Sequence, residues 1–444
     1  MITNLETVIQ TFSNHKGEFA EVKNPSYIFP SVEYYPLAKP LKKISQLKAA
    51  LMDMDGTTTT TEVLCIYSLE MMVRRMSNLL TKEQWHGIDH ALDLAHIIGN
   101  STTKHVEYLL KKYQNLLNTE QVYKEFLVAS QWTVLHGMDA QRKAEVVQNL
   151  KKLNIGGALT DIRNQMSQEL LIDKWSDKIP HPDFSMLVNL GIDIYYETYH
   201  RILALLKQGK SDEVRQQVFG VSDTDENLIS PMPGIPVLIP LIKGWLGDEA
   251  SLLSDELIAD YEKSTGKALN LGDKVKFALK LKWMGDYFEK KPVKLGLVTS
   301  SIFYEADIVI QEVISVMAAV IKRSSLSDAK KTFILEAYKD YHQIYDAFVT
   351  ASDSNEIRLK PHRDLYSIAL HKAGLMPEDF DKVVGFEDSQ SGTVAIRAAG
   401  IGCCIAVPFA QTLSHNLEAA SHVLPGGVPE AVFDFSLFLE SSIY

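Results

Sequence analysis

The chain has 444 residues, which is too long for one ordinary hydrophobic core, so we expect two or more domains. Hydrophobic residues make up 46% of it and charged residues 23%, as is typical of a soluble globular protein. The net charge of −11 argues against nucleic acid or an anionic membrane surface as a partner, and no apolar stretch approaches the ~20 residues that a membrane helix needs. Three cysteines without disulfide or zinc spacing, and a start that does not match a signal peptide, predict a cytoplasmic protein.

The first part of the chain contains one strand-like run. Residues 1–46 form a polar-to-aromatic segment with several prolines, which we expect to pack irregularly on the core as an extension. Residues 47–61 are the first part of the predicted core, and their apolar run ends in Asp53 and Asp55, as buried parallel strands often end. The threonines at 57–61 have high strand propensity and poor helix propensity, which predicts an extended exit from this strand.

The rest of the chain changes from a helical to an α/β pattern. Across residues 62–231, apolar residues recur every three or four positions, which predicts an all-helical domain with extra helices. Across residues 232–444, the strand-like runs "VKLGLVTSS", "DAFVTAS", "KVVGFEDS" and "GIGCCIAVP" alternate with helical stretches, as in βαβ units. We expect helical insertions in this part near 246–285 and 310–340. The predicted fold is α/β: a Rossmann-like parallel sheet with a large helical domain inserted after its first strand.

Polar side chains follow four of the predicted strands at or just past the point where each ends. Because ligands bind at the carboxyl ends of parallel strands, we expect these side chains to lie together. They are four acids, a hydroxyl cluster and one lysine: Asp53, Asp55, Thr299, Ser300, Ser301, Lys360, Glu387 and Asp388.

Chemistry explains this set better than packing does. Carboxylates that converge on one point repel each other unless a cation lies among them, and oxygen ligands without histidine or thiolate favour Mg²⁺. A carboxylate beside Mg²⁺ can act as a nucleophile and form an aspartyl-phosphate. A second carboxyl can protonate the leaving oxygen and later deprotonate a water, while a hydroxyl and a lysine hold the phosphoryl oxygens. The pattern therefore predicts Mg²⁺-dependent phosphoryl transfer.

Each motif alone also has an ordinary structural explanation. "DxDGT" can be a strand-to-turn exit, "VTSS" a strand end, Lys360 a solvated lysine and "FEDSQSG" a turn with a serine helix cap. Their joint occurrence, in order and each after a strand, is what favours a catalytic site. By contrast, nothing near His86, His90 and His96 completes a metal site, and we interpret these histidines as packing or surface residues.

The motifs "DMDGT", "LGLVTSS", "LKP" and "GFEDSQSG", in this order, resemble the four motifs of the haloacid dehalogenase superfamily. Within it, "FEDSQSG", "KPHRDLY" and "MPGIP" look like the β-phosphoglucomutase and phosphoglycolate-phosphatase branch. The resemblance covers about residues 48–60 and 290–410. It implies that Asp53 is the nucleophile and Asp55 the general acid/base, and because dehalogenases lack the second aspartate it favours phosphoryl transfer.

The resemblance implies roles for the other residues too. Thr299 would bind the phosphoryl group, and Lys360 would neutralise the nucleophile and the phosphate. The residues implied for Mg²⁺ are Asp53, Asp55 through its backbone carbonyl, Asp388, and Glu387 beside or behind them. Further candidates for substrate contact are Gly56, Thr57, Ser300 and Ser301.

Two residues beside the lysine depart from the family pattern. Leu359 stands where glycine is usual, and Arg363 replaces the second proline of "KPxP". The helical insert would be a cap that excludes water and selects the substrate. In similar enzymes a glycine-containing cap loop contacts the substrate, and the closest match is "IIGNSTTKHVEY", with a helix N-terminus that could bind an anion. The candidates in this loop are Gly99, Asn100 and Ser101.

These observations leave several functional hypotheses open. The first is a phosphatase that acts through an aspartyl-phosphate on a small phosphorylated metabolite, for example a sugar phosphate. The alternative is a phosphosugar mutase of β-phosphoglucomutase type, which needs a second phosphate contact in the cap. A phosphonate hydrolase would need a Schiff-base lysine, such as Lys82 or Lys104. The non-enzyme alternative is a phosphometabolite-binding or scaffold protein, although the chain retains the nucleophile and the metal ligands. The substrate and the oligomeric state stay open.

Overall fold

The computed structural model describes residues 4–14, 17–24, 28–97, 102–220, 227–409, 412–413 and 415–440. The chain divides into two compact units, which we call the core unit (Met1–Thr60 with Ile229–Tyr444) and the cap unit (Thr61–Leu228). Sequence reasoning predicts the inserted domain over residues 62–231. The cap unit is therefore a continuous segment, while the core unit is built from two segments on either side of it.

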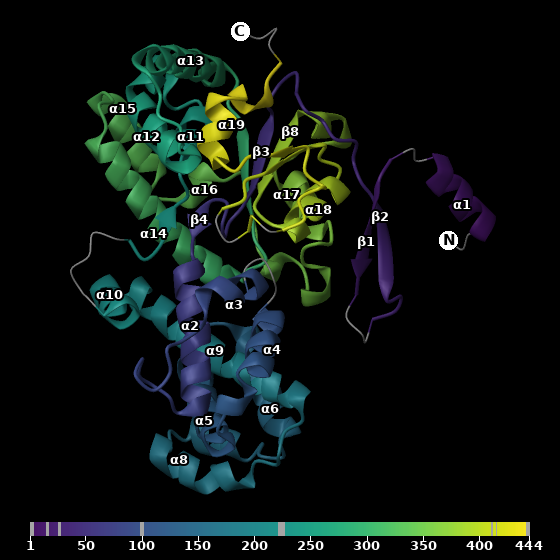
Figure 1. The fold of residues 1–444 in the computed structure, drawn as a ribbon, viewed down its shortest axis with the longest axis vertical. Helices are drawn as coiled ribbons and strands as arrows, with labels where there is room; N and C mark the ends of the chain where they lie inside the picture. The colour runs from purple at the N-terminus through teal and green to yellow at the C-terminus, as the bar shows by residue number, and fades with distance from the viewer. Residues whose placement is uncertain are drawn as a thin grey trace. The chain divides into compact units, whose positions relative to one another are not determined.

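A six-stranded sheet forms the centre of the core unit (Figure 1), in the order β10-β9-β8-β3-β6-β7. Its strands are β3 (Ala49–Asp53), β6 (Lys294–Val298), β7 (Ala347–Val349), β8 (Val383–Glu387), β9 (Cys403–Ala406) and β10 (His422–Val423). Every neighbouring pair is parallel, so the carboxyl ends of the six strands lie at one edge. The predicted α/β fold with a parallel sheet is confirmed.

The central strand β3 is buried along its whole length, as is its neighbour β8. Leu51 of β3 pairs with Gly296 on one side and Gly385 on the other. A Cβ at Gly296 would lie 2.5 Å from the Leu51 side chain, so the glycine makes room for the leucine. An apolar run such as this one is what a strand with two covered faces requires.

Helices α17 (Asp364–Lys372) and α18 (Gln390–Ala398) pack on the sheet. Leu365 and Tyr366 of α17 and Ile396 of α18 belong to one buried cluster with Leu51 and Val298. Burying such side chains supplies about 25 cal/mol per Å² of apolar surface removed from water. This packing fixes where α17 and α18 begin, and both begin near the carboxyl edge of the sheet.

The core unit carries helical segments beyond the sheet layers. They are α11 (Ile235–Ile242), η3 (Gly247–Leu253), α12 (Ser254–Thr265), α13 (Leu271–Lys290), α14 (Phe303–Arg323), α15 (Asp328–Ala337), α16 (Tyr341–Ile344) and α19 (Gly427–Phe433). The segments from η3 to α13, and the later part of α14 with α15, occupy the stretches where sequence reasoning expects insertions. Helix α13 lies so close to η3 that a Cβ at Gly285 would be 2.0 Å from the carbonyl oxygen of Gly247.

The N-terminal segment is more regular than the sequence suggests. It contains α1 (Leu5–Asn14) and an antiparallel hairpin of β1 (Phe19–Lys23) and β2 (Val32–Pro36). Val22 of β1 and Tyr35 of β2 are buried in a small apolar cluster with Ala398 of α18. The expectation of irregular packing is therefore wrong, because alternate apolar residues of the hairpin face α18 and order both strands.

The cap unit consists of helices. They are α2 (Glu62–Ser77), α3 (His90–Ile97), α4 (Thr102–Lys112), η1 (Gln114–Leu116), α5 (Thr119–His136), α6 (Ala140–Lys152), α7 (Ala158–Arg163), α8 (Gln168–Trp175), η2 (Ser176–Lys178), α9 (Phe184–Lys207) and α10 (Ser211–Phe219). Helix α9 contacts α2, α4, α5 and α6, which makes it the centre of the unit. A Cβ at Gly191 of α9 would lie 2.9 Å from Val106 of α4, so this glycine lets the two helices approach closely.

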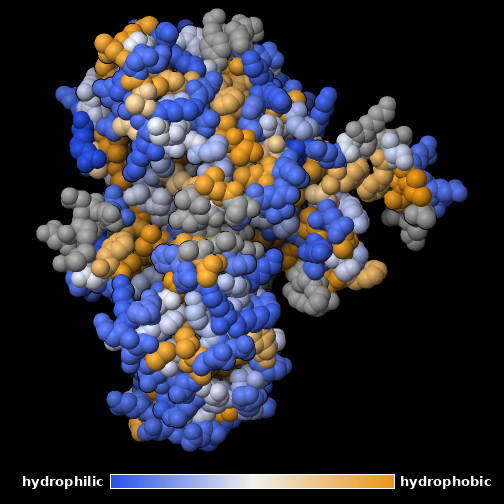
Figure 2. All heavy atoms as spheres, viewed as in Figure 1, coloured by the Kyte–Doolittle hydropathy of each residue, from blue (hydrophilic) through white to orange (hydrophobic). Residues whose placement is uncertain are grey.

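Hydrophilic residues cover much of the face seen in Figure 2, with hydrophobic residues in small groups between them. Large exposed apolar side chains, such as Phe29 and Leu271, occur at scattered positions. Single exposed apolar residues are ordinary on protein surfaces. Among the helices of the described ranges, none combines the length and the apolar character that crossing a membrane would require.

Candidate active site

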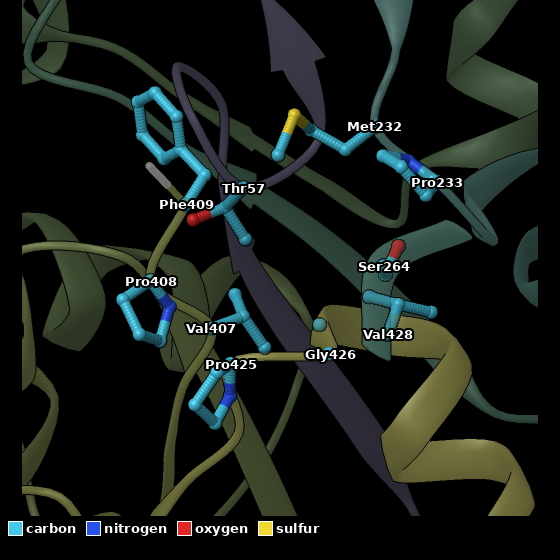
Figure 3. A pocket seen from close by; sticks show the side chains of 11 residues that line it. Thr57, Met232, Pro233, Ser264, Val407, Pro408, Phe409, Pro425, Gly426 and Val428 are labelled. Carbon is cyan, nitrogen blue, oxygen red and sulfur yellow. The ribbon is translucent and has the colours of Figure 1, made fainter. Parts of the chain in front are cut away.

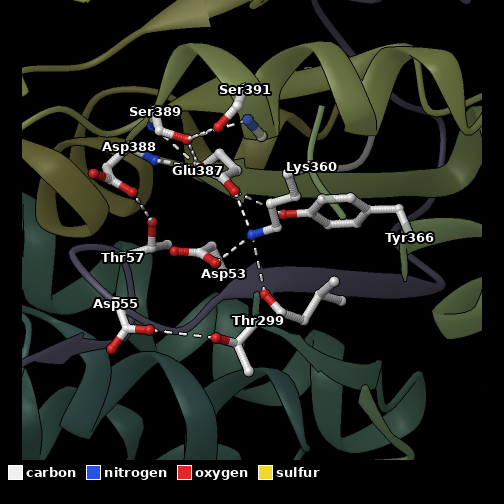
Figure 4. A network of polar contacts seen from close by, with 12 residues as sticks. Asp53, Asp55, Thr57, Thr299, Lys360, Tyr366, Glu387, Asp388, Ser389 and Ser391 are labelled. Atoms are coloured by element: carbon white, nitrogen blue, oxygen red, sulfur yellow. Dashed lines mark hydrogen bonds and ion pairs between the residues drawn. The ribbon is translucent and has the colours of Figure 1, made fainter. Parts of the chain in front are cut away.

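The carboxyl end of β3 meets the loop that precedes α17. Asp53 is the last residue of β3 and only 6% of it is exposed. The Nζ atom of Lys360 donates a hydrogen bond to Asp53 Oδ1, another to Glu387 Oε1 at 2.6 Å and a third to the carbonyl oxygen of Val298 at 3.2 Å (Figure 4). Three predicted site residues from separate stretches of the chain are thus in direct contact.

Glu387, at the end of β8, accepts hydrogen bonds on both carboxylate oxygens. Lys360 Nζ and the Tyr366 hydroxyl, the latter at 3.3 Å, donate to Oε1. The backbone N–H groups of Asp388 and Ser389 donate to Oε2 at 3.1 Å each, and the Ser389 hydroxyl does so at 2.9 Å. A carboxylate has about four lone-pair positions. These five donors therefore use the acceptor capacity of Glu387 and fix its orientation.

Asp388 completes an acidic cluster at this edge. Oxygen atoms of Asp53, Glu387 and Asp388 lie within 4.8 Å of one another, and all three residues are buried. In the part of the chain that the structure describes, this is the group of acidic, histidine or cysteine side chains that could hold a metal ion. Thr57 Oγ1 donates to Asp388 Oδ1 at 3.4 Å. Gly56 has a φ of +81°, and a Cβ there would lie 2.8 Å from Asp388 Oδ2.

Asp55 lies on the other side of the loop after β3 and contacts the end of β6. The hydroxyl groups of Thr299 and Ser301 donate to its Oδ2 atom at 3.3 and 3.2 Å. Thr299 is buried, and its own Oγ1 accepts a hydrogen bond from the backbone N–H of Ser301 at 3.0 Å. Ser300 is exposed between them. The second aspartate is thus held by hydroxyl groups, whereas Asp53 is held by a lysine.

Three buried carboxylates converge in this cluster, those of Asp53, Glu387 and Asp388. Lys360 forms ion pairs with the first two. Burial and the carboxylate of Glu387 raise the pKa of Asp53, against the effect of Lys360. Burial lowers the pKa of Lys360, but Asp53 and Glu387 outweigh it and raise the pKa above its ordinary value. A cation among the carboxylates would relieve their mutual repulsion, and a set of hard oxygen donors fits Mg²⁺.

A pocket of about 200 Å³ adjoins this cluster (Figure 3). Its lining is mostly apolar, with hydroxyl groups from Thr57 and Ser264 and two glycines: Thr57, Met232, Pro233, Ser264, Val407, Pro408, Phe409, Pro425, Gly426, Gly427 and Val428. Thr57 contributes both to this pocket and to the acidic cluster through Asp388. The pocket therefore offers an apolar surface within the core unit next to the charged groups.

Some predicted residues are not part of this cluster. The cap loop candidates Gly99, Asn100 and Ser101 lie outside the described residues. Three histidines that sequence reasoning assigns to packing or surface are exposed, namely His86, His90 and His96. The His96 ring stacks on Tyr108 with 4.5 Å between ring centroids.

Sequence reasoning missed Tyr366 and part of the role of Gly392. Tyr366 is fully buried, and its hydroxyl reaches Glu387 while its ring lies 5.2 Å from Lys360 Nζ. A Cβ at Gly392 would lie 1.7 Å from Glu387 Oε1, so only glycine fits there. Ser389 caps α18 by accepting from the Gly392 N–H at 3.1 Å and also binds Glu387. In the sequence, the features that could have indicated these two roles are the spacing of six residues from Lys360 to Tyr366 and the glycine in "FEDSQSG".

The parallel sheet, the helical unit inserted after β3 and the motif residues gathered at one sheet edge define the class of protein. This arrangement is the one that the resemblance to the haloacid dehalogenase superfamily implies, and the resemblance predicted from the sequence is confirmed.

Comparisons with known proteins give distant similarities. The chain is 23% identical to a protein named "Phosphorylated carbohydrates phosphatase" from Thermotoga maritima over 208 residues, which cover 47% of this chain and 74% of that protein. No protein-family model matches the chain.

Solved structures are similar at low identity. CbbY from Rhodobacter sphaeroides in complex with phosphate has 16% identity and a TM-score of 0.37, with 85% of this chain and 94% of that chain covered. A putative beta-phosphoglucomutase from Thermotoga maritima has 15% identity and a TM-score of 0.36, with 88% and 99% covered. At these TM-scores the solved structures lend no support to a functional assignment.

Proposed function

We propose that the chain is a Mg²⁺-dependent phosphatase that acts through an aspartyl-phosphate on a small phosphorylated metabolite. The observation that carries this proposal is the convergence of the buried carboxylates of Asp53, Glu387 and Asp388 at the sheet edge, where Lys360 pairs with the first two. Such an arrangement is unfavourable by itself and becomes favourable when a cation and a phosphoryl group bind. The similarity to the Thermotoga maritima phosphatase makes phosphorylated carbohydrates the first substrates to test.

The carboxylates of the site have two proposed roles: some bind the metal ion, and one orients the residues around it. Asp53, Asp388 and the backbone carbonyl of Asp55 would hold Mg²⁺, which would neutralise the charge of the phosphoryl oxygens. Glu387 already accepts from five donors, so we assign it to orienting Lys360 and the start of α18 behind the metal ligands.

The first chemical step is the transfer of the phosphoryl group to Asp53. A carboxylate oxygen of Asp53 attacks phosphorus, and the bond from phosphorus to the substrate oxygen breaks. Asp55, protonated at this stage, gives its proton to the leaving oxygen. Lys360 contacts Asp53 directly and would also bind a phosphoryl oxygen. The further candidates for contact with the phosphoryl group are Thr299, Ser300, Ser301, Gly56 and Thr57.

The second step releases inorganic phosphate. Asp55, now a carboxylate, takes a proton from water, and the water oxygen attacks the phosphorus of the aspartyl-phosphate. The bond from Asp53 to phosphorus breaks, which restores the carboxylate of Asp53. The hydroxyl groups of Thr299 and Ser301 keep Asp55 in place for both proton transfers.

The experiment measures phosphate release from a panel of phosphorylated sugars, nucleotides and glycolytic acids, with and without Mg²⁺. Asp53→Asn keeps the shape of the side chain but removes the nucleophile, and we expect it to abolish release. Asp381→Asn, at an exposed carboxylate, is the matched control and should release phosphate like the parent chain. Release that survives Asp53→Asn would contradict the mechanism.

A negative result on the whole panel would favour the other hypotheses. If the folded chain binds Mg²⁺ but releases no phosphate, the next assay is phosphosugar isomer interconversion primed by a bisphosphate, which tests a mutase. If neither reaction occurs while a phosphorylated ligand still binds, the chain would be a binding protein.

A further inference from the structure

The loop that carries Lys360 is held by the N-terminal hairpin. Arg358, two residues before Lys360, donates from Nη1 to both carboxylate oxygens of Glu33 in β2, at 3.1 and 3.0 Å. Its Nε and Nη2 atoms donate to Asp364 at 2.9 and 3.0 Å, at the start of α17. Arg358 therefore ties the beginning of the loop to its end and fastens both to the hairpin. Bidentate pairs of this kind fix geometry as well as energy.

A second contact holds the other side of the lysine. The Tyr35 hydroxyl lies 2.6 Å from Glu33 Oε2 and 2.9 Å from Nδ1 of His362, two residues after Lys360. A hydroxyl has one hydrogen, and because a carboxylate only accepts, Tyr35 donates to Glu33 and accepts from the His362 N–H. Tyr35 and His362 are both buried, so these bonds are shielded from water.

The flanking contacts and the lysine point in different directions. Arg358 and His362 face β2 of the hairpin, whereas the side chain between them, Lys360, reaches Asp53 and Glu387 at the sheet edge. A lysine side chain has four rotatable bonds, so the position of its nitrogen depends on where the backbone is held. A misplacement of about 1 Å can cost up to a hundredfold in rate.

We propose that Glu33 and Tyr35 are positioning residues, which hold the backbone on both sides of Lys360 so that its ammonium group reaches Asp53. This inference rests on the proposed function for the role of Lys360 in phosphoryl binding. It gives the N-terminal segment a task at the active site, although the hairpin itself touches neither Asp53 nor the acidic cluster among the contacts of the described residues.

The two departures from the family pattern fall in the same loop. The Arg363 guanidinium lies over the Tyr35 ring, 5.9 Å from its centroid, and thus contacts the hairpin directly. Leu359 packs against the buried cluster that includes residues of α17 and the sheet. Both residues that depart from the family pattern therefore lie in a loop that contacts the hairpin on one side and the buried cluster of the core on the other.

Two adjacent tyrosines of β2 provide a matched test. Tyr35→Phe removes the hydroxyl that joins Glu33 to His362. Tyr34→Phe removes a hydroxyl that bonds Glu21 at 3.2 Å on the exposed face of the same strand. Binding of inorganic phosphate in the presence of Mg²⁺ is measured by calorimetry, and hydrogen exchange of residues 356–364 is measured by mass spectrometry.

We expect Tyr35→Phe to weaken phosphate binding about fivefold and to speed exchange in the lysine loop, because two hydrogen bonds are lost. Tyr34→Phe should change neither. In a Lys360→Met background, Tyr35→Phe should no longer affect phosphate binding, since its effect passes through the lysine. A merely structural role would lower thermal stability without this dependence on Lys360.

The inference is overturned if Tyr35→Phe leaves both phosphate binding and loop exchange unchanged, or weakens binding equally in the Lys360→Met background. If Tyr35→Phe does not fold, Glu33→Gln replaces it, with Glu21→Gln as the control on the exposed face. Failure of the proposed function is distinguishable: a chain that binds phosphate without releasing it from any substrate contradicts the phosphatase, while phosphate binding and loop exchange still decide the role of the hairpin.

Discussion

The two units each contain a group of ion-paired side chains, and the two groups differ in how their carboxylates are arranged. In the cap unit, Arg75 donates to Glu125 at 2.7 Å and to Glu197 at 2.5 Å, and Arg201 also binds Glu197. Two guanidinium groups there face two carboxylates. In the core unit, three carboxylates converge on one another, and Lys360 pairs with two of them, Asp53 and Glu387.

This difference separates a structural network from a binding site. Removing a charge from water costs several kcal/mol, which a partner of opposite charge with good hydrogen bonds can offset. The cap network meets that condition with its own residues. In the core cluster three carboxylates also converge on one another, and we expect a bound cation to offset part of their repulsion. Converging buried carboxylates are therefore a stronger mark of function than buried charge as such.

Lys360→Met would break the core cluster most severely. It leaves the three carboxylates without their ammonium group, and we expect phosphate release to fall by about 10³, close to 4 kcal/mol of transition-state stabilisation. We also expect the melting temperature to fall in the absence of Mg²⁺ and to recover partly when it is added. Lys382→Met, at a surface pair with Asp379, is the control for loss of a lysine. Equal melting temperatures with and without Mg²⁺ would contradict a metal ion bound at this cluster.

Arg75→Met tests the ion-pair network of the cap unit. It leaves Glu125 and Glu197 without their shared partner, and breaking a buried pair costs about 4 kcal/mol. Hydrogen exchange of α9 should speed up accordingly, and added Mg²⁺ should not reverse the effect. Arg215→Met, whose partner Asp212 is largely exposed, should have little effect on α9. If Mg²⁺ restored slow hydrogen exchange of α9 in Arg75→Met, Mg²⁺ would stabilise the cap network as well as the core cluster, and the two groups would not differ in metal binding.

The core motifs could be predicted because each follows a strand that is apolar along its length. Asp53 after "AALM" and Glu387 after "VVGF" are positioned by the sheet itself, so a parallel arrangement is enough to bring them together. The contacts around Lys360 could not be predicted in this way. Tyr35 and His362 are 327 positions apart, and neither lies at the end of a sheet strand of the core.

The hairpin shows why local pattern was insufficient. Its strands are five residues each and are separated by a proline-containing loop, so periodicity over such short runs is weak. Its order comes from packing on α18 and from the bonds of Glu33 to Arg358. These tertiary contacts override the irregular appearance of the sequence.

Asp193 extends the comparison to a carboxylate in the cap unit that is held by an amide. It is buried in α9 and accepts from Asn149 Nδ2 at 2.7 Å, and burial raises its pKa from 3.8 to about 6. The folded state therefore binds the proton more tightly than the unfolded state. The resulting stability is fully present below about pH 4 and is lost as the pH rises through 6.

Asp193→Asn removes this titration. We expect it to stabilise α9 at pH 8 by up to about 3 kcal/mol and to have little effect at pH 4, because one pKa unit corresponds to about 1.4 kcal/mol. Hydrogen exchange of α9 at several pH values measures the difference. Asp183→Asn, at the exposed N-cap of the same helix, is the control, since asparagine caps about as well as aspartate. A stabilisation that does not vary with pH would show that Asp193 is not the titrating group.

Thr57→Val makes the smallest change, at the edge of the acidic cluster. The Thr57 hydroxyl donates to Asp388 at 3.4 Å, a long bond, so we expect its loss to raise the Mg²⁺ concentration for half-maximal phosphate release only about fivefold, or ~1 kcal/mol. Thr59→Val is the matched control, because the Thr59 hydroxyl bonds the carbonyl oxygen of Met54 at 3.2 Å and not a metal candidate. If Thr59→Val changed the Mg²⁺ requirement as much as Thr57→Val, the fold of the threonine loop would matter more than its bond to Asp388. A change confined to Thr57→Val would instead show that the cluster is tuned from the loop after β3, where the sequence places its hydroxyl side chains.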